Sequence, residues 1–220
     1  DLIIVVASKN DDLIKMTQRA IDSCLADGAD VNVIVVETFK KTEYRGANKT
    51  VMYEGEFNYN RCLNTGIKYA KGDVFILANN DIIFERGWSQ IGYLMEYNNY
   101  LSASALSNDR RQKIFRRGNV AYEGYLIGLY LTGWCIFAHK KVFEQIGKLD
   151  ETHKFWYSDD VYAEQLRQAK IKHALICNCV VNHLVSKTLS TKPIKERHIL
   201  TYAEGKRVHK TNRENIQTKL

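Results

Sequence analysis

Two side chains in this sequence stand where a divalent cation could be held. Asn79-Asn80-Asp81 directly follows an apolar run over residues 74–78, and a carboxylate such as Asp81 is the ligand type that Mg²⁺ and Mn²⁺ prefer. The same position also suits a polar turn. His183 follows a later apolar run, and an imidazole beside a carboxylate would suit Mn²⁺. The pair therefore predicts a metal site only if folding brings His183 to Asp81.

A second candidate is the acidic pair Asp159-Asp160, which begins a helix predicted over residues 159–169. Adjacent carboxylates at a helix start cap it and complement its dipole. A carboxylate there could also take the proton from an attacking hydroxyl group. The residues alone leave both interpretations open.

The elements that must position these groups alternate along the chain. We expect strands over residues 2–7, 31–37, 74–78, 101–106, 127–138 and 174–182, and helices over residues 12–26, 57–70, 88–97, 140–146 and 159–169. This pattern predicts a single α/β domain with a mostly parallel central sheet flanked by helices. Ligands of such sheets bind beyond the carboxyl ends of the strands, here near Ser8, Glu37 and Asp81.

The sequence lacks two glycine-rich motifs by which α/β folds bind phosphate groups. The turn Ala7-Ser8-Lys9-Asn10 after the first predicted strand is not GxGxxG, and the chain contains no GxxxxGK[ST] motif. Dinucleotide and P-loop folds are therefore disfavoured. Glu37 ends the second predicted strand, where an acid can accept ribose hydroxyl groups.

The composition is that of a folded, basic protein. Hydrophobic residues make up 45% and charged residues 26%, and the net charge is 32 − 25 = +7, which excludes a disordered or collagen-like chain. No apolar run approaches the ~20 residues of a membrane span, no signal-peptide pattern is present, and five cysteines without CxxC spacing indicate reduced thiols. We expect a cytoplasmic protein, in solution or peripheral at a membrane surface; the sequence predicts no oligomeric state.

Two basic clusters bear on the partner. The first cluster lies in a predicted loop and consists of Arg110, Arg111, Lys113, Arg116 and Arg117. The second lies near the C-terminus and consists of Lys206, Arg207, Lys210, Arg213 and Lys219. Such runs are usually solvated surface. They would also suit an anionic partner, such as a phosphorylated glycan or lipid or a modified nucleic acid.

Taken in order, these segments resemble the GT-A fold of nucleotide-sugar glycosyltransferases, closest to the family 2 type, from Leu2 to about Ser186. The most specific segment, Phe57 to Ile67 (FNYNRCLNTGI), is similar to the Phe-Asn…Leu-Asn-x-Gly helix of that family and of related galactosyltransferases. Asn79-Asn80-Asp81 stands at the family's Asp-x-Asp, and Asp159-Asp160 at its Glu-Asp pair. Because Asn79 stands in place of the first acid of Asp-x-Asp, the resemblance leaves Asp81 and His183 as the metal ligands.

The resemblance implies an inverting transfer of a sugar from a nucleotide sugar, by default a UDP-sugar, to an acceptor hydroxyl, with Mn²⁺ or Mg²⁺ as cofactor. It implies Asp160 as general base, assisted by Asp159, and an acceptor site at Gly133, Trp134 and Tyr157; core packing is the alternative role of Trp134. It implies nucleotide-sugar binding by Ala7, Ser8, Asn10, Glu37, Asn58, Arg61, Asn64, Asn79 and Asn80.

The implied organisation is a glycosyltransferase domain over residues 1–190, with a nucleotide-sugar half over about 1–105 and an acceptor half over about 106–190. A basic extension follows over residues 191–220. Two other functions stay open. A non-catalytic nucleotide- or nucleic-acid-binding module would fit the loss of the acid at Asn79. A nucleotidyltransferase is less favoured, because it is expected to have a glycine-rich phosphate loop.

Overall fold

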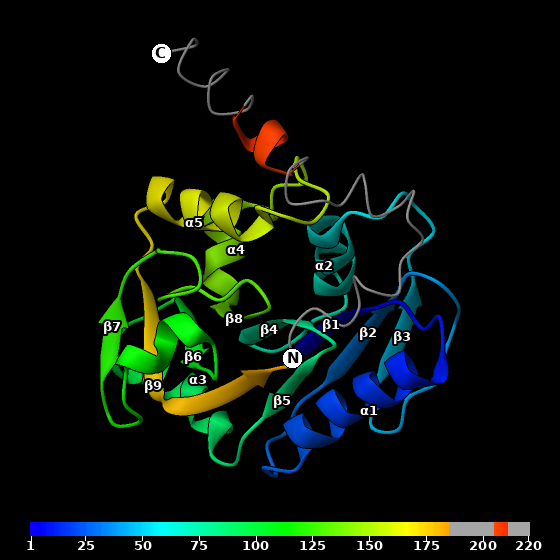
Figure 1. The fold of residues 1–220 in the computed structure, drawn as a ribbon, viewed down its shortest axis with the longest axis horizontal. Coiled ribbons are helices and arrows are strands. Elements are labelled where there is room, and N and C mark those ends of the chain that lie inside the picture. The colour runs from blue at the N-terminus through cyan, green and yellow to red at the C-terminus, as the bar shows by residue number, and fades with distance from the viewer. Residues whose placement is uncertain (185–204, 211–220) are drawn as a thin grey trace.

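The computed structural model describes residues 1–184 and 205–210 and contains one sheet of nine strands, ordered β3-β2-β1-β4-β8-β6-β9-β5, with β7 paired to β9 (Figure 1). The strands are β1 (Leu2–Val6), β2 (Val33–Glu37), β3 (Lys49–Met52), β4 (Val74–Asn79), β5 (Ile82–Phe84), β6 (Ser102–Leu106), β7 (Ala121–Glu123), β8 (Cys135–His139) and β9 (His173–His183). The helices are α1 (Asp11–Leu25), α2 (Tyr59–Ile67), α3 (Ile91–Tyr97), α4 (Lys140–Ile146) and α5 (Ser158–Gln168), with 3₁₀ turns η1 (Trp88–Gln90) and η2 (Arg110–Ile114).

The sheet has a parallel half and a mixed half. β1 pairs in parallel with β2 and β4, and β2 with β3. Beyond β4 the pairing is mostly antiparallel, through β4–β8, β6–β8, β7–β9 and β5–β9, with only β6–β9 parallel. The predicted α/β class and flanked single sheet are confirmed, whereas the predicted parallel order holds only for the first half. Apolar runs indicate buried strands but not their direction, and each antiparallel pair here joins strands that are not consecutive in the chain.

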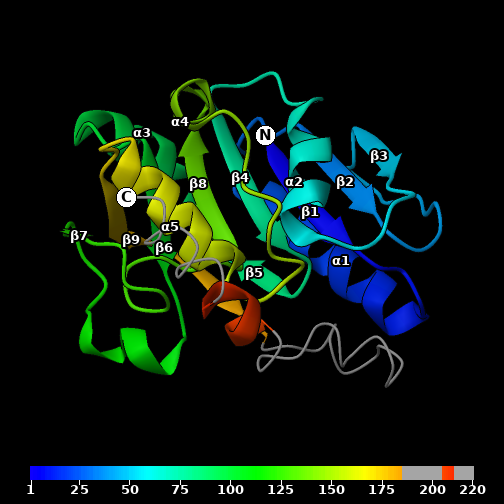
Figure 2. The same cartoon turned by 90° about the horizontal axis from the view of Figure 1, so that it is seen from above.

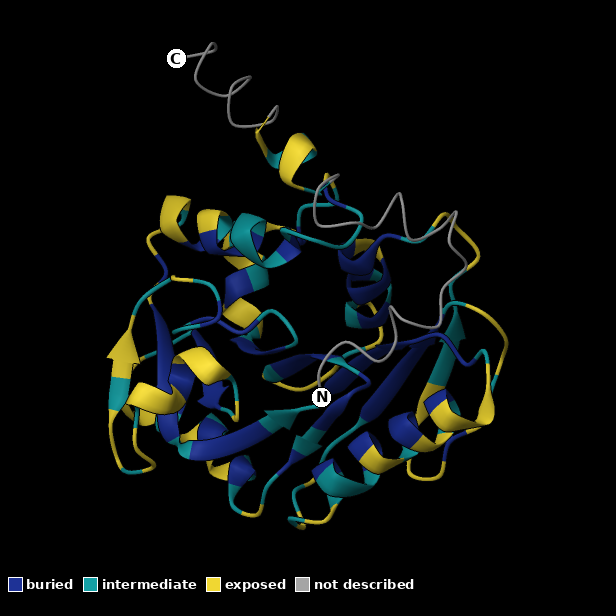
Figure 3. Cartoon of the chain, in the orientation of Figure 1, coloured by how far each residue is buried: buried dark blue, intermediate teal, exposed yellow. Residues whose placement is uncertain are grey.

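Alternating side chains of the buried strands form two core layers. On β1, Leu2, Ile4 and Val6 pack in the layer covered by α1 and α3. Ile3 and Val5 pack in the opposite layer, covered by α2, α4 and α5. This period of two is the geometry of a strand buried on both faces. Figure 2 shows helices on both sides of the sheet, and Figure 3 shows their buried inner faces.

Some predicted elements differ from those observed. β3, β5 and β7 lie in segments for which we predicted no strand, because each is too short to show a periodicity. The strand predicted over residues 127–138 begins only at Cys135, since the preceding residues form turns closed by Tyr130 N–H to Leu126 O and Gly128 N–H to Leu131 O. The predicted extension over residues 191–220 lies mostly outside the described residues, of which 205–210 form a short helix.

None of the helices in the described part of the chain combines the length and the apolar character that crossing a membrane requires.

Candidate active site

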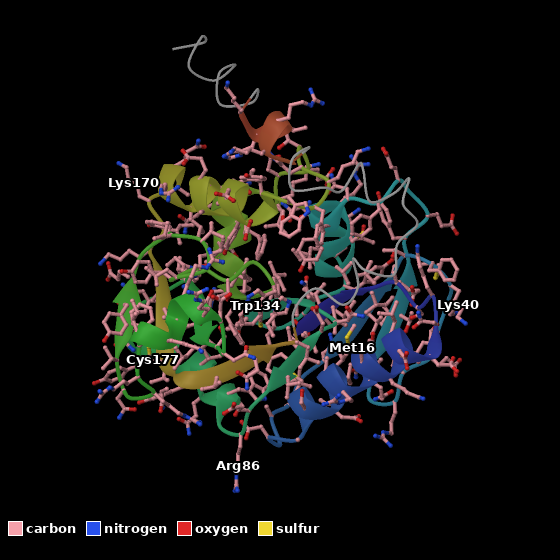
Figure 4. The ribbon with its side chains drawn as sticks, viewed as in Figure 1. Met16, Lys40, Arg86, Trp134, Lys170 and Cys177 are labelled. Atoms are coloured by element: carbon pink, nitrogen blue, oxygen red, sulfur yellow. The ribbon has the colours of Figure 1, made fainter. Side chains whose placement is uncertain are left out.

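A single cavity collects several of the predicted site residues at the carboxyl ends of β1 and β4. Its polar or small lining includes Ala7, Thr38, Asn79, Asn80, Asp81, Gly133, Ser158, Asp159 and His183. Its aromatic lining is Phe57, Tyr59, Trp134, Phe155, Trp156 and Tyr157. Figure 4 shows Trp134 near the centre of the molecule, whereas Lys40, Arg86 and Lys170 lie at its rim.

The β5–β9 ladder brings His183 to Asp81. The antiparallel register pairs Ile82 with His183, and the amide of Leu184 donates to the carbonyl of Asp81 at 2.7 Å. His183 Nε2 consequently lies 3.2 Å from Asp81 Oδ1. Because β9 is continuous from residue 173, the whole sheet fixes this distance.

The Asp81–His183 pair is suited to hold a cation. Both Asp81 Oδ1 and His183 Nε2 are buried, and neither has a hydrogen-bond partner among the described residues. A buried polar atom without a hydrogen bond costs about 1–3 kcal/mol, so the fold keeps two potential metal-ligand atoms, 3.2 Å apart, at a cost in stability. The described residues contain no cluster of three or more His, Cys, Asp or Glu ligands. Two protein ligands fit a metal that completes its shell with substrate phosphate and water.

Trp134 supports the imidazole of this pair. Its indole stacks on the His183 ring, with centroids 5.1 Å apart and planes 5° from parallel. The Trp134 carbonyl in turn accepts from the Asn79 amide at 2.9 Å, which ties the indole to the end of β4. Trp134 thus fixes the orientation of His183 and also forms part of the cavity wall.

Asp159, at the first turn of α5, is the carboxylate that faces the cavity. It shares a helix face with the buried Tyr162 and Leu166, whereas Asp160 shares one with the exposed Glu164 and Arg167. Asp159 lines the cavity and Asp160 does not. Of the two carboxylates to which the resemblance assigns roles, Asp159 is therefore the one that the structure places at the cavity. The helical spacing of apolar residues after residue 158 could have distinguished the two carboxylates in the sequence, because it puts Asp159 on the apolar face of the helix and Asp160 on the polar face.

The environment of Asp159 makes it a stronger base than an ordinary aspartate. Burial, and then the charge of Asp160, raises the pKa of Asp159 from 3.8 to about 6. Gly133 makes this position possible, because a Cβ at residue 133 would lie 2.5 Å from Asp159 Oδ2. A carboxylate with a pKa near neutrality is suited to general-base catalysis.

Tyr59 is a candidate that sequence reasoning missed. It begins α2, is only 6% exposed and lines the cavity, yet its hydroxyl has no hydrogen-bond partner among the described residues. Burial is the main cause that raises the pKa of Tyr59 well above its ordinary value. The phenol therefore keeps its proton, and it can donate that proton to a ligand in the cavity. No spacing signal in the sequence distinguishes this tyrosine from the other twelve.

Backbone hydrogen bonds and a ring contact hold the other aromatic residues of the cavity wall. The amide of Tyr59 donates to the carbonyl of Lys154 at 2.7 Å, which joins α2 to the segment leading into α5. Tyr157 precedes α5 with φ +69°, a conformation uncommon for a non-glycine residue. His209, in the described part of the predicted extension, stacks on Tyr157 with ring centroids 4.7 Å apart. The extension thus reaches the cavity wall.

Glu37, Ser8 and Asn10 serve the scaffold instead of the cavity. Glu37 is fully buried, and its carboxylate accepts from the amides of Ser8, Thr38 and Phe39, each at 3.0 Å, and from the Ser8 hydroxyl. The side chain of Asn10 caps α1 by accepting from the Leu13 amide. None of these three residues lines the cavity, and their contact with a nucleotide stays a prediction.

Asn58, Arg61 and Asn64 likewise bind another part of the chain. We call Asn58, Asn60 and Asn64 the asparagine clamp, because each donates its amide to a backbone carbonyl in residues 149–151, at 2.7 to 2.8 Å. Asn64 also accepts from the Leu149 amide at 3.0 Å. Arg61 forms an ion pair with Glu151 at 3.2 Å. The clamp fixes the start of the segment that carries Phe155 to Asp159, and none of its residues lines the cavity.

The cavity lining carries two carboxylates and, among the described residues, no lysine or arginine. A diphosphate bound there would need a compensating positive charge, which a cation at Asp81 and His183 would supply. The positive charge of Arg111 acts against burial and Asp160 by lowering the pKa of Asp159.

The architecture is similar to that of a solved structure described as GalNAc-T7 with UDP, GalNAc and Mn²⁺. The TM-score is 0.66 at 11% sequence identity, over 83% of this chain and 42% of that chain. This chain therefore spans less than half the length of the GalNAc-T7 chain, and at this identity the likeness shows the fold alone. The arrangement of the sheet and its flanking helices is GT-A-like. No family model and no curated protein matches the sequence.

Proposed function

We propose that this protein is an inverting, metal-assisted glycosyltransferase that moves a sugar from a nucleotide sugar, by default a UDP-sugar, to an acceptor hydroxyl group. One observation carries the proposal: two unsatisfied cation-ligand atoms and a carboxylate of raised pKa face the same aromatic cavity. The likeness of the fold to a structure determined with UDP, GalNAc and Mn²⁺ supports it.

Asp81 and His183 would hold Mn²⁺ or Mg²⁺. When bound, the cation supplies positive charge for the diphosphate that leaves. Asn79, Asn80 and Ala7, at the ends of β4 and β1, are the proposed contacts to the nucleotide sugar. Phe57 and Phe155, 6.2 Å apart between ring centroids, offer apolar faces for sugar or base.

Asp159 is the proposed general base, in place of Asp160. It takes the proton of the acceptor hydroxyl while that oxygen forms the new bond to the anomeric carbon. The bond from that carbon to the diphosphate oxygen breaks, and its electron pair leaves with the nucleotide. The acceptor would lie between Asp159, Gly133 and the Trp134–Tyr157 wall, with the Tyr59 hydroxyl donating to donor or acceptor.

The proposed domain division follows the same geometry. The nucleotide-sugar half, about residues 1–105, supplies Asp81 and Tyr59. The acceptor half, about residues 106–190, supplies Asp159 and Trp134.

The test is release of UDP from a panel of UDP-sugars, with and without Mn²⁺, by the wild type, Asp159→Asn and Asp160→Asn. General-base catalysis contributes about 10²–10⁴-fold, so we expect Asp159→Asn to lose about a thousandfold in rate. Asp160→Asn is the matched control and should keep a rate within about tenfold of the wild type. Equal losses in both variants, or activity retained in Asp159→Asn, would contradict the assignment of the base. Nucleotide binding without turnover in the wild type would favour a binding module.

A further inference from the structure

One surface of the molecule combines unpaired cations with exposed aliphatic side chains. We define the basic–apolar patch as Arg110, Lys113, Ile114, Arg116, Val120 and Leu126. In the described part of the chain, eight large apolar side chains are exposed, and four of them lie between residues 114 and 126. Ile114 is 73% exposed and Leu126 61%. Single exposed apolar residues are ordinary, but such a concentration marks an interaction surface.

The fold holds this patch as one unit. Phe115 points inward and contacts the Tyr122 ring, with centroids 4.7 Å apart, beside the small core of Leu106 and Leu175. Its neighbour Ile114 is thereby directed outward. Arg111 and Gln112 of η2 donate to the carbonyls of Ile127 and Leu129, at 3.0 and 2.9 Å. The η2 turn and the segment carrying Leu126 are therefore joined, and Figure 2 shows η2, in green at the lower left, projecting from the body.

The cations of the patch are available to a partner. Arg110, Lys113 and Arg116 are exposed and form no ion pair with any residue in the described ranges, whereas Arg111 pairs with Asp109 at 3.6 Å and Arg117 with Glu85 at 3.4 Å. Three uncompensated positive charges thus fall within seven residues, on both sides of Ile114. A surface charge of this density attracts anions within about 10 Å at ordinary ionic strength.

We propose that the basic–apolar patch docks the protein on a lipid bilayer that exposes anionic head groups. Lys113 and Arg116 would contact the head groups while Ile114 and Leu126 enter the interface between head groups and acyl chains. Exposed aliphatic side chains favour a bilayer over a nucleic acid, whose recognition uses hydrogen bonds and aromatic stacking.

This inference does not depend on the proposed sugar transfer and can be tested without an enzyme assay. The measurement is cosedimentation of the full chain with vesicles of phosphatidylcholine alone or with added phosphatidylglycerol. We expect binding to the anionic vesicles only. Each basic residue near such a surface contributes about 1 kcal/mol, or about fivefold in affinity, so Lys113→Gln with Arg116→Gln should weaken binding about 25-fold.

The matched control is Lys15→Gln with Arg19→Gln, on the exposed face of α1, which changes the net charge by the same amount. We expect this pair to lose less than about twofold. Ile114→Ser should weaken binding about tenfold, whereas Tyr97→Ser, at a 75% exposed residue of α3, should not. Equal binding to both vesicle types, equal losses in the two glutamine pairs, or no effect of Ile114→Ser would overturn the proposal. Binding to a nucleic-acid homopolymer but not to vesicles would overturn it in favour of that partner.

Discussion

The cavity and the asparagine clamp lie at opposite ends of the same short segment, and both are built from buried polar side chains. In the clamp, the amide groups of Asn58, Asn60 and Asn64 are all bonded to backbone carbonyls of residues 149–151. In the cavity, Tyr59 Oη, Asp81 Oδ1 and His183 Nε2 have no hydrogen-bond partner among the described residues, although the last two atoms lie 3.2 Å apart. A satisfied buried group stabilises the fold, and an unsatisfied one costs free energy. Whether its buried polar groups are hydrogen-bonded therefore distinguishes the scaffold from the candidate site, although both adjoin the same segment of the chain.

Among the buried polar groups of the cavity, we expect Asp159 to have the largest effect on the free energy of unfolding. Its pKa is raised in the folded state, so ionisation destabilises the fold as pH rises from about 4 to about 6. Asp159→Asn removes that cost, and we expect it to raise the free energy of unfolding by roughly 3 kcal/mol at pH 8, since one pKa unit is worth about 1.4 kcal/mol. Below pH 4 the gain should vanish. Urea unfolding at both pH values measures this, and a gain that does not depend on pH would contradict the raised pKa.

In the asparagine clamp we expect a substitution to lower the free energy of unfolding, whereas Asp159→Asn should raise it. Asn64→Ala removes the partners of both the Leu149 amide and the Leu149 carbonyl in a buried region. We expect a loss of about 2 kcal/mol in the free energy of unfolding, because each unsatisfied buried group costs about 1–3 kcal/mol. The control is Thr65→Ala, the next residue of α2, which is half-buried and whose hydroxyl donates to the Arg61 carbonyl of the same helix; this variant should change stability by less than about 0.5 kcal/mol. If Asn64→Ala were as stable as the control, the clamp would not be the structural element described.

A third prediction concerns the pH dependence of activity. A base must be ionised to accept a proton, so the rate should rise with pH through the pKa of Asp159, about 6. Between pH 5 and pH 7 we expect an increase of about tenfold in kcat/KM. The profile should lose this step in Asp159→Asn and keep it in Asp160→Asn. A midpoint near pH 4 would show that the base lies outside this buried environment.

The smallest expected effect is at Tyr59. Removing its unpartnered hydroxyl in Tyr59→Phe should leave the free energy of unfolding within about 0.5 kcal/mol of the wild type. It should weaken UDP-sugar binding about fivefold, the worth of one hydrogen bond of about 1 kcal/mol. Calorimetric titration measures the affinity. A large loss of stability without loss of affinity would make Tyr59 part of the scaffold.

The sequence predicted most of the strands, because long apolar runs and their polar ends indicate where buried strands lie and end. The residues alone left open whether His183 meets Asp81, and only the resemblance implied the pair. The sequence did not predict β5, whose three residues show no periodicity, although β5 creates that meeting. It also placed Asn58, Arg61 and Asn64 at the nucleotide. Residue type cannot reveal whether a buried amide is bonded to the chain or directed into a cavity, because partners more than eighty residues away decide that.

The most direct test of the account is thermal melting of the chain with UDP, with and without Mn²⁺, for the wild type and Asp81→Asn. A ligand at ~100 times its dissociation constant adds about 2.7 kcal/mol to stability, which gives a clear rise in melting temperature. We expect that UDP stabilises the wild type, that Mn²⁺ increases this stabilisation, and that Asp81→Asn abolishes the Mn²⁺ increment. The absence of any shift with millimolar UDP and Mn²⁺, or an equal shift in Asp81→Asn, would contradict it.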